Sequence, residues 1–221
     1  MDQLYDATPV ERRLVDKATQ LRIPISASFE LTPLCNLSCD MCYVRMNARE
    51  VAMHGNVRSI DEWLKTAEEL KAMGTLFILL TGGEPLLYPG FNELYLALRE
   101  MGFIITINTN ATLITEKVAE LFSHVKPRRL NVSLYGGCNE TYKDLCHISN
   151  GYDRCIQGLQ LLKKYHIDTK LNLTIIRKNR KDYEAVIRMA EELDMPAFIN
   201  CYTSLFCSPT CPSQLNIPEI R

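Results

Sequence analysis

Three cysteine side chains lie within eight residues of this chain, which reads CNLSCDMC at positions 35–42. Cys35, Cys39 and Cys42 therefore follow the spacing C-x3-C-x2-C. Side chains this close would have to diverge to pack as independent core thiols, unless a group at their centre draws them together. Because thiolates are the preferred ligands of zinc and of iron–sulfur clusters, the spacing indicates a metal centre.

The number of thiols separates two kinds of metal centre. A structural zinc ion takes four protein ligands, whereas a four-iron cluster held by three cysteines leaves one iron free to bind another group. Zinc stays an open alternative, with Cys39 and Cys42 as a half-site and His54 as the candidate fourth ligand. Chance clustering of ordinary buried cysteines is the third interpretation.

A second stretch with unusual chemistry reads TGGEP at positions 81–85. Gly82 and Gly83 carry no side chains, so backbone groups there can approach a ligand closely. Glu84 adds a carboxylate suited to an ammonium group, and Pro85 fixes the turn. An ordinary strand-to-helix turn is the simpler interpretation of a Gly-Gly pair that stands alone.

Apolar patterns predict the strands that position these two stretches. Alternation over residues 25–31 predicts a strand that leads into the cysteine loop. The continuous apolar run at 76–80 predicts a second strand, buried on both faces as in a parallel sheet. Further strands are predicted at residues 103–107, 130–134, 170–176 and 197–205.

Helical patterns fill most of the segments between these strands. Ser59 and Glu62 form a capping box that begins a helix, and Gly74 ends it. Residues 44–58 are predicted to be irregular and to wrap around the cysteine loop, with His54 in solvent. Further helices are predicted at residues 10–21, 91–98, 115–124, 152–165 and 183–190.

Six strands that alternate with helices indicate an α/β fold with parallel strands, which we interpret as an incomplete TIM-like (βα)6 barrel. Such a sheet places its chemistry at the carboxyl ends of its strands. The cysteine loop follows the first predicted strand, and the TGGEP turn follows the second. The fold therefore predicts that the two stretches meet at one end of the barrel.

Together the two motifs resemble the signature of the radical S-adenosylmethionine (radical SAM) enzymes. Hydrophobic Met41 before the last cysteine and aromatic Tyr43 after it fit that signature. The resemblance implies that the three cysteines bind one [4Fe-4S] cluster, and that the Gly-Gly-Glu turn holds the amino group of S-adenosylmethionine (SAM). The residues that it assigns to cofactor binding are Met41, Gly82, Gly83, Glu84, Pro85, Asn110 and Ser133.

The last two assignments come from weaker matches. Thr109-Asn110-Ala111 resembles the family's Thr-Asn-Gly, and Ser133 matches a family serine that contacts the cofactor. Many relatives follow that serine with Leu-Asp-Gly, whereas this chain has Tyr135 in place of the aspartate. If that aspartate serves substrate or radical chemistry in the family, the resemblance does not assign the same role to Tyr135.

The resemblance is closest to the peptide- and protein-modifying branch, whose members carry C-terminal (SPASM-type) extensions with auxiliary clusters. It implies reductive cleavage of SAM to methionine and a 5′-deoxyadenosyl radical, which takes hydrogen from a peptide or protein side chain. It also implies an electron donor of the flavodoxin or ferredoxin type. The alternative function is a zinc- or iron–sulfur-stabilised binding or electron-transfer module without SAM chemistry, although an electron carrier does not need the Gly-Gly-Glu turn.

We expect three parts in the chain: an N-terminal leader at residues 1–22, a radical SAM core at 23–205, and a short tail at 206–221. The tail holds Cys207 and Cys211 and resembles the start of an auxiliary-cluster region, but one pair of thiols cannot close a cluster. We therefore expect the chain to stop short of the extension. The remaining thiols of the core, Cys138, Cys146 and Cys155, are predicted to be ordinary packed or surface residues.

Composition excludes several other classes of protein. The 221 residues are 47% hydrophobic and 23% charged, which is ordinary for a globular domain. A net charge of -1 gives no electrostatic case for nucleic acid or an anionic membrane as partner. The N-terminus lacks a signal peptide's apolar core, and no apolar run is long enough to span a bilayer. Because thiols that bind metal must stay reduced, the nine cysteines predict a cytoplasmic location.

Overall fold

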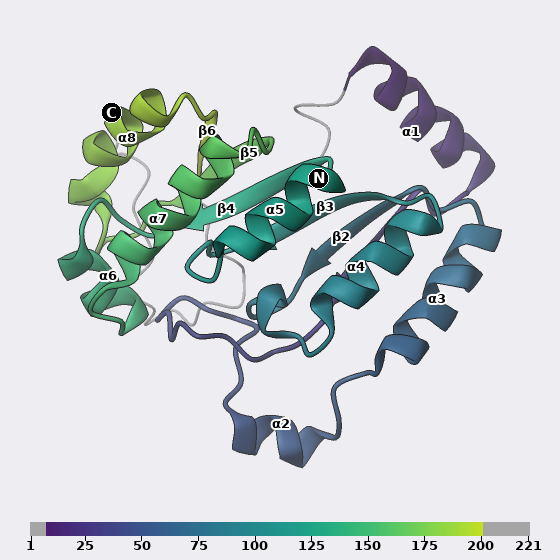
Figure 1. The fold of residues 1–221 in the computed structure, drawn as a ribbon, viewed down its shortest axis with the longest axis horizontal. Coiled ribbons are helices and arrows are strands. Elements are labelled where there is room, and N and C mark those ends of the chain that lie inside the picture. Colours follow the sequence, from purple (N-terminus) through teal and green to yellow (C-terminus); the bar gives the residue numbers. More distant parts are fainter. Residues whose placement is uncertain (1–7, 201–221) are drawn as a thin grey trace.

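The computed structural model describes residues 8–200, which form one six-stranded parallel sheet with helices on one face (Figure 1). The strands lie across the sheet in chain order, and at least one helix joins each strand to the next. They are β1 (Ser26–Glu30), β2 (Phe77–Thr81), β3 (Ile104–Thr109), β4 (Arg129–Leu134), β5 (Thr169–Thr174) and β6 (Ala197–Asn200). Within the described chain β1 and β6 are the edges, which confirms the predicted α/β fold with an incomplete parallel barrel.

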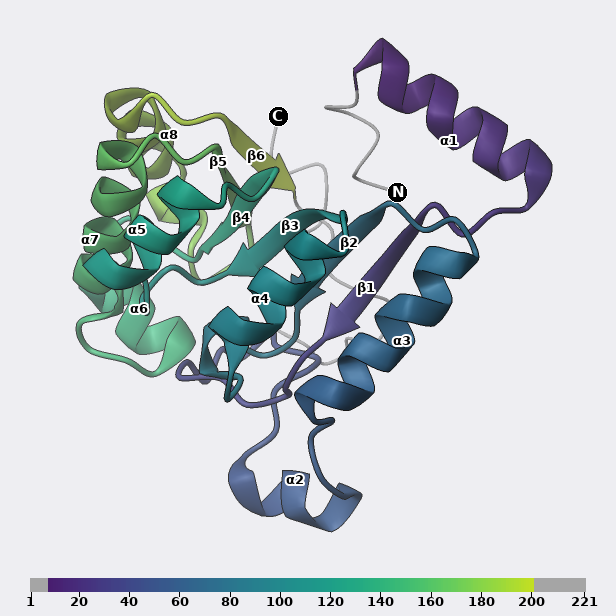
Figure 2. The same ribbon diagram turned by 45° about the vertical axis from the view of Figure 1, so that its right-hand side comes forward.

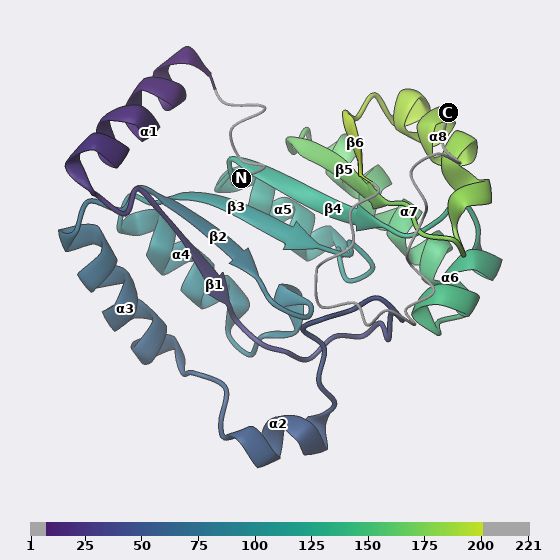
Figure 3. The same cartoon turned by 180° about the vertical axis from the view of Figure 1, so that it is seen from behind.

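Most helices cover the same face of the sheet, and within residues 8–200 no helix covers the opposite face, which is seen from behind (Figures 1 and 3). The helix α1 extends away from this layer beside the start of β1, and Glu11 on α1 pairs with Arg128 before β4 at 2.8 Å (Figure 2). The α-helices are α1 (Pro9–Leu21), α2 (Ala48–His54), α3 (Ile60–Ala72), α4 (Phe91–Glu100), α5 (Glu116–His124), α6 (Asn139–Cys146), α7 (Gly151–Lys164) and α8 (Tyr183–Leu193). Two short 3-10 helices are η2 (Pro85–Leu87) and η3 (Arg180–Asp182).

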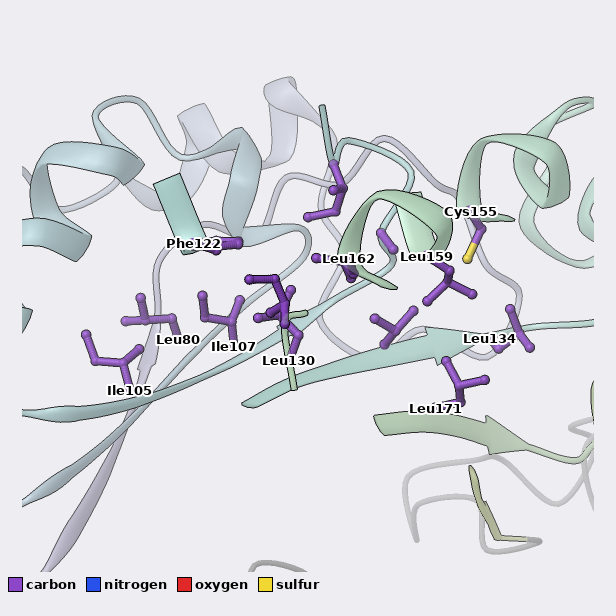
Figure 4. Close-up of a cluster of buried hydrophobic side chains, with 14 of the residues drawn as sticks. Leu80, Ile105, Ile107, Phe122, Leu130, Leu134, Cys155, Leu159, Leu162 and Leu171 are labelled. Carbon is purple, nitrogen blue, oxygen red and sulfur yellow. The ribbon is translucent and has the colours of Figure 1, made fainter. Parts of the chain in front are cut away.

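The hydrophobic core lies between the sheet and the helices (Figure 4). Successive strand residues point to opposite faces, so Ile105 and Ile107 of β3 are fully buried while Thr106 and Asn108 face the open side half-buried. The same alternation holds in β2, where Leu79 is only half-buried. The prediction that β2 is buried on both faces is therefore wrong, because none of the helices described in residues 8–200 covers the inner face of the incomplete barrel.

The predicted positions of the strands are confirmed, but two helices were missed. Residues 44–58 were predicted to be irregular, and instead contain α2, which Asn47 and Glu50 begin with a capping box. The segment before α7 contains α6, whose first residues lack a side-chain cap. The strand predicted at residues 197–205 is found at Ala197–Asn200, and the rest of it lies outside the described residues.

Candidate functional site

The cysteine loop after β1 and the Gly-Gly-Glu turn after β2 are hydrogen-bonded to each other. The amide of Gly83 donates to the carbonyl of Thr32 at 2.6 Å, and the amide of Glu84 donates to the carbonyl of Leu34 at 2.8 Å. A Cβ atom on Gly83 would lie 2.2 Å from the Leu34 oxygen, so any side chain there would collide with the loop backbone. We expected glycine here to let backbone approach a ligand; the backbone that approaches it is the cysteine loop itself.

The three cysteines of the loop differ in their exposure to solvent. Cys35 and Cys39 are partly buried and Cys42 is exposed. Backbone amides point at two of the sulfurs, with Leu37 N 3.4 Å from Cys35 Sγ and Arg45 N 3.3 Å from Cys42 Sγ. Amide donors of this kind suit thiolate sulfurs that carry negative charge, so the donor set fits an iron–sulfur cluster.

The thiol of Cys35 lies near other groups that can carry negative charge. Burial, the largest cause, and the nearby charges of Glu84, Cys39 and Cys42 raise its pKa to about 11, although the hydrogen bond from the Leu37 amide lowers it. A cationic metal centre among the three sulfurs would reverse this effect and favour the thiolates. Within residues 8–200, no three His, Cys, Asp or Glu side chains gather tightly enough to hold a single metal ion, and this applies to Cys35, Cys39 and Cys42 as well as to the alternative zinc set with His54, which is exposed as expected.

Glu84 is completely buried between the cysteine loop and the end of β3. Its carboxylate accepts hydrogen bonds from the Thr109 hydroxyl at 2.8 Å, from the Asn110 amide at 2.8 Å and from the Leu86 amide at 3.2 Å. Burial raises the pKa of Glu84 to about 7 despite these three donors, which lower it. Since a carboxylate can accept about four hydrogen bonds, the chain's own donors fill three positions, and an ammonium group can reach the fourth only if the turn around this buried side chain moves.

Asn110 connects the end of β3 to the cysteine loop. Its Nδ2 atom lies 3.7 Å from Cys35 Sγ and donates to Asn36 Oδ1 at 3.0 Å. Its Oδ1 atom accepts from the amide and hydroxyl of Thr112, at 3.0 and 2.6 Å, and Thr112 in turn accepts from Asn36. Asn36 and Thr112 were not predicted as site residues, because the bonds that join Asn36 to Thr112 and Asn110 span more than seventy residues of sequence.

The other residues assigned to the cofactor lie around this centre. Ser133 is half-buried on the open face at the carboxyl end of β4, and its hydroxyl is hydrogen-bonded to Tyr135. Met41 packs partly buried against the core, and Pro85 is buried at the first position of η2. The structure thus brings the predicted residues to one end of the sheet, as the fold predicted.

Contacts of Asp40 join the cysteine loop to the segments that follow α6 and β5. Asp40 accepts hydrogen bonds from His147, at 2.6 Å, and from Lys178, which follows β5. Partial burial raises the pKa of Asp40, but these two partners outweigh it and hold the pKa below its ordinary value. No sequence motif marks His147 or Lys178, since both reach Asp40 only through the fold.

The whole of this constellation lies in the part of the chain that matches a known family. The sequence pattern of the Radical SAM superfamily matches residues 29–190, most of the chain. The chain belongs to the radical SAM superfamily. Its members use a [4Fe-4S] cluster and SAM, and the three thiols beside a carboxylate at the strand ends fit that pair of cofactors.

Relatives of this radical SAM chain have several activities. It is 27% identical over 175 residues to the AdoMet-dependent heme synthase of Methanosarcina barkeri, covering 79% of this chain and 49% of that protein. It is also 27% identical over 165 residues to the sporulation killing factor maturation protein SkfB of Bacillus subtilis, covering 75% and 39%. This chain therefore spans about half the length of these curated relatives, or less.

Solved structures show the same fold. Streptococcus suis SuiB, bound to its precursor peptide SuiA, matches with a TM-score of 0.73 and 20% identity, covering 95% of this chain and 47% of that one. That likeness confirms the architecture of an incomplete barrel. None of the helices in residues 8–200 combines the length and apolar character that crossing a bilayer requires.

Proposed function

We propose that this chain is the SAM-cleaving core of a radical SAM enzyme that modifies a peptide or protein side chain. The observation that carries the proposal is the joint structure of the two loops, in which the Gly83 and Glu84 amides are bonded to the cysteine loop. This arrangement fixes three thiols and a buried carboxylate at one end of the sheet. A binding module or an electron carrier needs the thiols, but it has no use for Glu84 beside them.

The cofactors set what the residues of this chain must do. When bound, the cluster and SAM together supply one-electron cleavage of SAM to methionine and a 5′-deoxyadenosyl radical, which takes a hydrogen atom from the substrate. Cys35, Cys39 and Cys42 would hold the cluster through their thiolates. Glu84 offers its remaining acceptor position to the ammonium group of SAM, and a cation there favours the ionised form of this carboxylate.

Gly82, Pro85, Met41, Asn110 and Ser133 complete the SAM site in this proposal. Gly82 and Pro85 hold the turn in shape, since Gly82 has φ +136° and Pro85 begins η2. Asn110 orients Cys35, Met41 borders the cluster, and Ser133 lies on the open face where the ribose or carboxylate of SAM would reach.

The substrate enters from the open face of the sheet in this proposal. Half-buried polar side chains line that face, and Asn131 donates to Asn108 across β3 and β4 at 2.9 Å. Similarity to SkfB, a maturation protein, and to SuiB, which was solved with a precursor peptide, supports a peptide substrate. We further propose a flavodoxin- or ferredoxin-type electron donor, a cytoplasmic location, and the division into a leader at 1–22, a core at 23–205 and a tail at 206–221.

The first experiment tests the cleaving activity. The full chain, reconstituted without oxygen, is expected to be brown and to contain iron and sulfide in similar amounts. With dithionite and SAM it is expected to release 5′-deoxyadenosine slowly without added substrate. Colourless protein that contains zinc after anaerobic expression would instead identify a zinc-stabilised scaffold and overturn the proposal.

The second experiment tests the substrate class. A deuterated candidate precursor peptide is expected to transfer deuterium into 5′-deoxyadenosine, and a small open reading frame beside the gene for this chain would supply such a candidate. Because one relative is a heme synthase, a deuterated tetrapyrrole serves as the competing substrate. Deuterium that comes only from the tetrapyrrole would overturn the peptide assignment and leave the SAM-cleaving core intact.

A further inference from the structure

Cys146, the last residue of α6, lies beside the cluster ligand Cys39. The amides of Ser38 and Asp40, on either side of Cys39, donate to the carbonyls of Cys146 and Leu145, both at 3.0 Å. The cysteine loop therefore runs along the carboxyl end of α6 (Figures 1 and 3). The Cys146 side chain is completely buried, and its thiol is hydrogen-bonded to the Cys39 sulfur. The prediction that Cys146 is an ordinary packed thiol did not anticipate this contact.

Tyr135 approaches the same sulfur from the end of β4. Its hydroxyl is hydrogen-bonded to Cys39, and this is the residue that stands in place of the family's aspartate. Its backbone is held on both sides, because its amide lies 3.4 Å from the Tyr142 hydroxyl and its carbonyl accepts from Asn179 at 3.0 Å. Its ring meets Tyr142 edge to face at 5.9 Å between centroids. The position of the hydroxyl is thus fixed by packing.

The chemistry of these groups assigns the donors. As a cluster ligand, Cys39 would be a thiolate, which has no proton to give and accepts hydrogen bonds. The Tyr135 hydroxyl and the Cys146 thiol each carry a proton and are hydrogen-bonded to the Cys39 sulfur. Cys39 is therefore the acceptor, and Tyr135 and Cys146 are the donors.

We propose that Tyr135 and Cys146 donate hydrogen bonds to the sulfur of cluster ligand Cys39 and thereby raise the reduction potential of the cluster. The inference rests on the cluster assignment made above. Reduction adds negative charge to the cluster and its sulfur ligands, and donors that point at a ligand sulfur stabilise that charge. Tyr135 and Cys146 are positioning residues, since they act through Cys39.

The test is the midpoint potential of the reconstituted full chain, followed by electron paramagnetic resonance during reductive titration. The variants Tyr135→Phe and Cys146→Ala each remove one donor, whereas Cys146→Ser keeps a donor. Each single loss is expected to lower the equilibrium constant for reduction about threefold, and the double variant about tenfold, which is about 59 mV for one electron. Cys146→Ser is expected to stay near the wild-type potential, and the Fe–S(Cys) stretching bands should shift only in the variants that lose a donor.

Cys155→Ala is the matched control. Cys155 is an equally buried thiol, but its hydrogen-bond partner is Tyr142 and not a cluster ligand. This variant is expected to keep the wild-type potential. Unchanged potentials in Tyr135→Phe and Cys146→Ala at full iron content, or an equal shift in Cys155→Ala, would overturn the inference.

The outcomes also separate this inference from the proposed function. Wild-type protein that binds no iron overturns both, and this is seen before any potential is measured. If the loaded protein cleaves SAM but the midpoint potential is the same in wild type, Tyr135→Phe and Cys146→Ala, only the role of Tyr135 and Cys146 is overturned. If Cys146→Ala does not retain iron, Tyr135→Phe decides, because phenylalanine preserves the ring packing against Tyr142.

Discussion

The amide of Gly83 is hydrogen-bonded to the carbonyl of Thr32 at 2.6 Å, which makes the turn after β2 a support for the loop after β1. Two segments about fifty residues apart thus form one structural unit. Parallel pairing of β1 with β2, with Glu30 opposite Thr81, places the two exits side by side. The cysteine loop is therefore held by the turn after β2 as well as by its own strand, β1.

This support changes the expected effect of a side chain at Gly83. From the sequence alone, Gly83→Val is predicted to weaken SAM binding while the cluster persists. In the structure a Cβ would lie 2.2 Å from the Leu34 oxygen and 2.7 Å from the Pro33 oxygen, both backbone atoms. We therefore expect Gly83→Ala to displace the cysteine loop, to cost about 1–3 kcal/mol in unfolding free energy, and to lose iron.

Urea unfolding and iron analysis of Gly83→Ala test this prediction. Gly102→Ala is the control, because Gly102 has open space around it and φ +92°. It should cost only the backbone strain, about 1 kcal/mol, and retain its iron. Full iron content and wild-type stability in Gly83→Ala would show that the two loops do not depend on each other.

The buried carboxylate of Glu84 predicts a pH dependence of stability. Its pKa is about 7 in the folded chain and near 4.5 when unfolded, so between these values the folded state binds the extra proton. The unfolding free energy should therefore fall as the pH rises from 4.5 to 7 and stay low above it, by up to about 3 kcal/mol. Glu84→Gln should abolish this part of the profile.

Urea unfolding of cluster-free protein between pH 5 and pH 8 measures the effect, as the difference between wild type and variant. Glu93→Gln, at an exposed position of α4, should keep the wild-type profile. Parallel profiles for wild type and Glu84→Gln would mean that Glu84 stays ionised throughout, and that the protein stabilises its charge better than described above.

Much of this fold was predictable because its strands show an alternation of apolar and polar residues, or an apolar run in β2, and are bounded by polar turns. The strands β1 to β5 were placed correctly, since alternation and turn residues are local signals. The helix α6 was missed because Cys138 gives it no side-chain cap and its sequence, NETYKDLC, is largely polar. Only its buried face, with Tyr142, Leu145 and Cys146, shows in the structure why it forms.

The candidate site was predictable only in part, for a similar reason. The three cysteines and Glu84 are marked by local motifs, but Cys146 meets Cys39 from more than a hundred residues away.

The backbone conformation of Ala111 also could not be predicted from its local sequence. Ala111 occupies the place of the family's glycine yet keeps the left-handed conformation, with φ +59°, at a cost of about 1–2 kcal/mol. A Cβ on Gly158 would lie 2.3 Å from its oxygen, so packing against α7 holds it there.

The tail cysteines give a prediction about iron content. Cys207 and Cys211 lie outside the described residues, and two thiols cannot close a four-iron cluster. Replacing both by Ala should leave the iron content and the yield of 5′-deoxyadenosine nearly unchanged. A loss of about half the iron would show that the tail carries a second cluster.

The last prediction concerns the donor that Asn110 presents to Cys35. Asn110→Asp keeps the size of the side chain and the acceptor for Thr112, but it replaces the Nδ2 donor with a second oxygen. That oxygen would face the Cys35 sulfur at about the present 3.7 Å, and the Asn36 oxygen at 3.0 Å. Because a neighbouring anion raises the pKa of a thiol, and the pKa of Cys35 is already about 11, Cys35 should ligate iron less readily.

Iron uptake at several pH values measures this effect. Asn110→Asp should load less iron than wild type at pH 7.5 and recover part of it as the pH rises. The matched control is Asn131→Asp, which makes the same change in an Asn–Asn pair on the open face, where Asn131 bonds to Asn108 at 2.9 Å. It should load iron normally. Equal loading in the two variants would mean that Asn110 contributes only to the packing of the loop, and that the hydrogen bond to Cys35 has no part in holding the cluster.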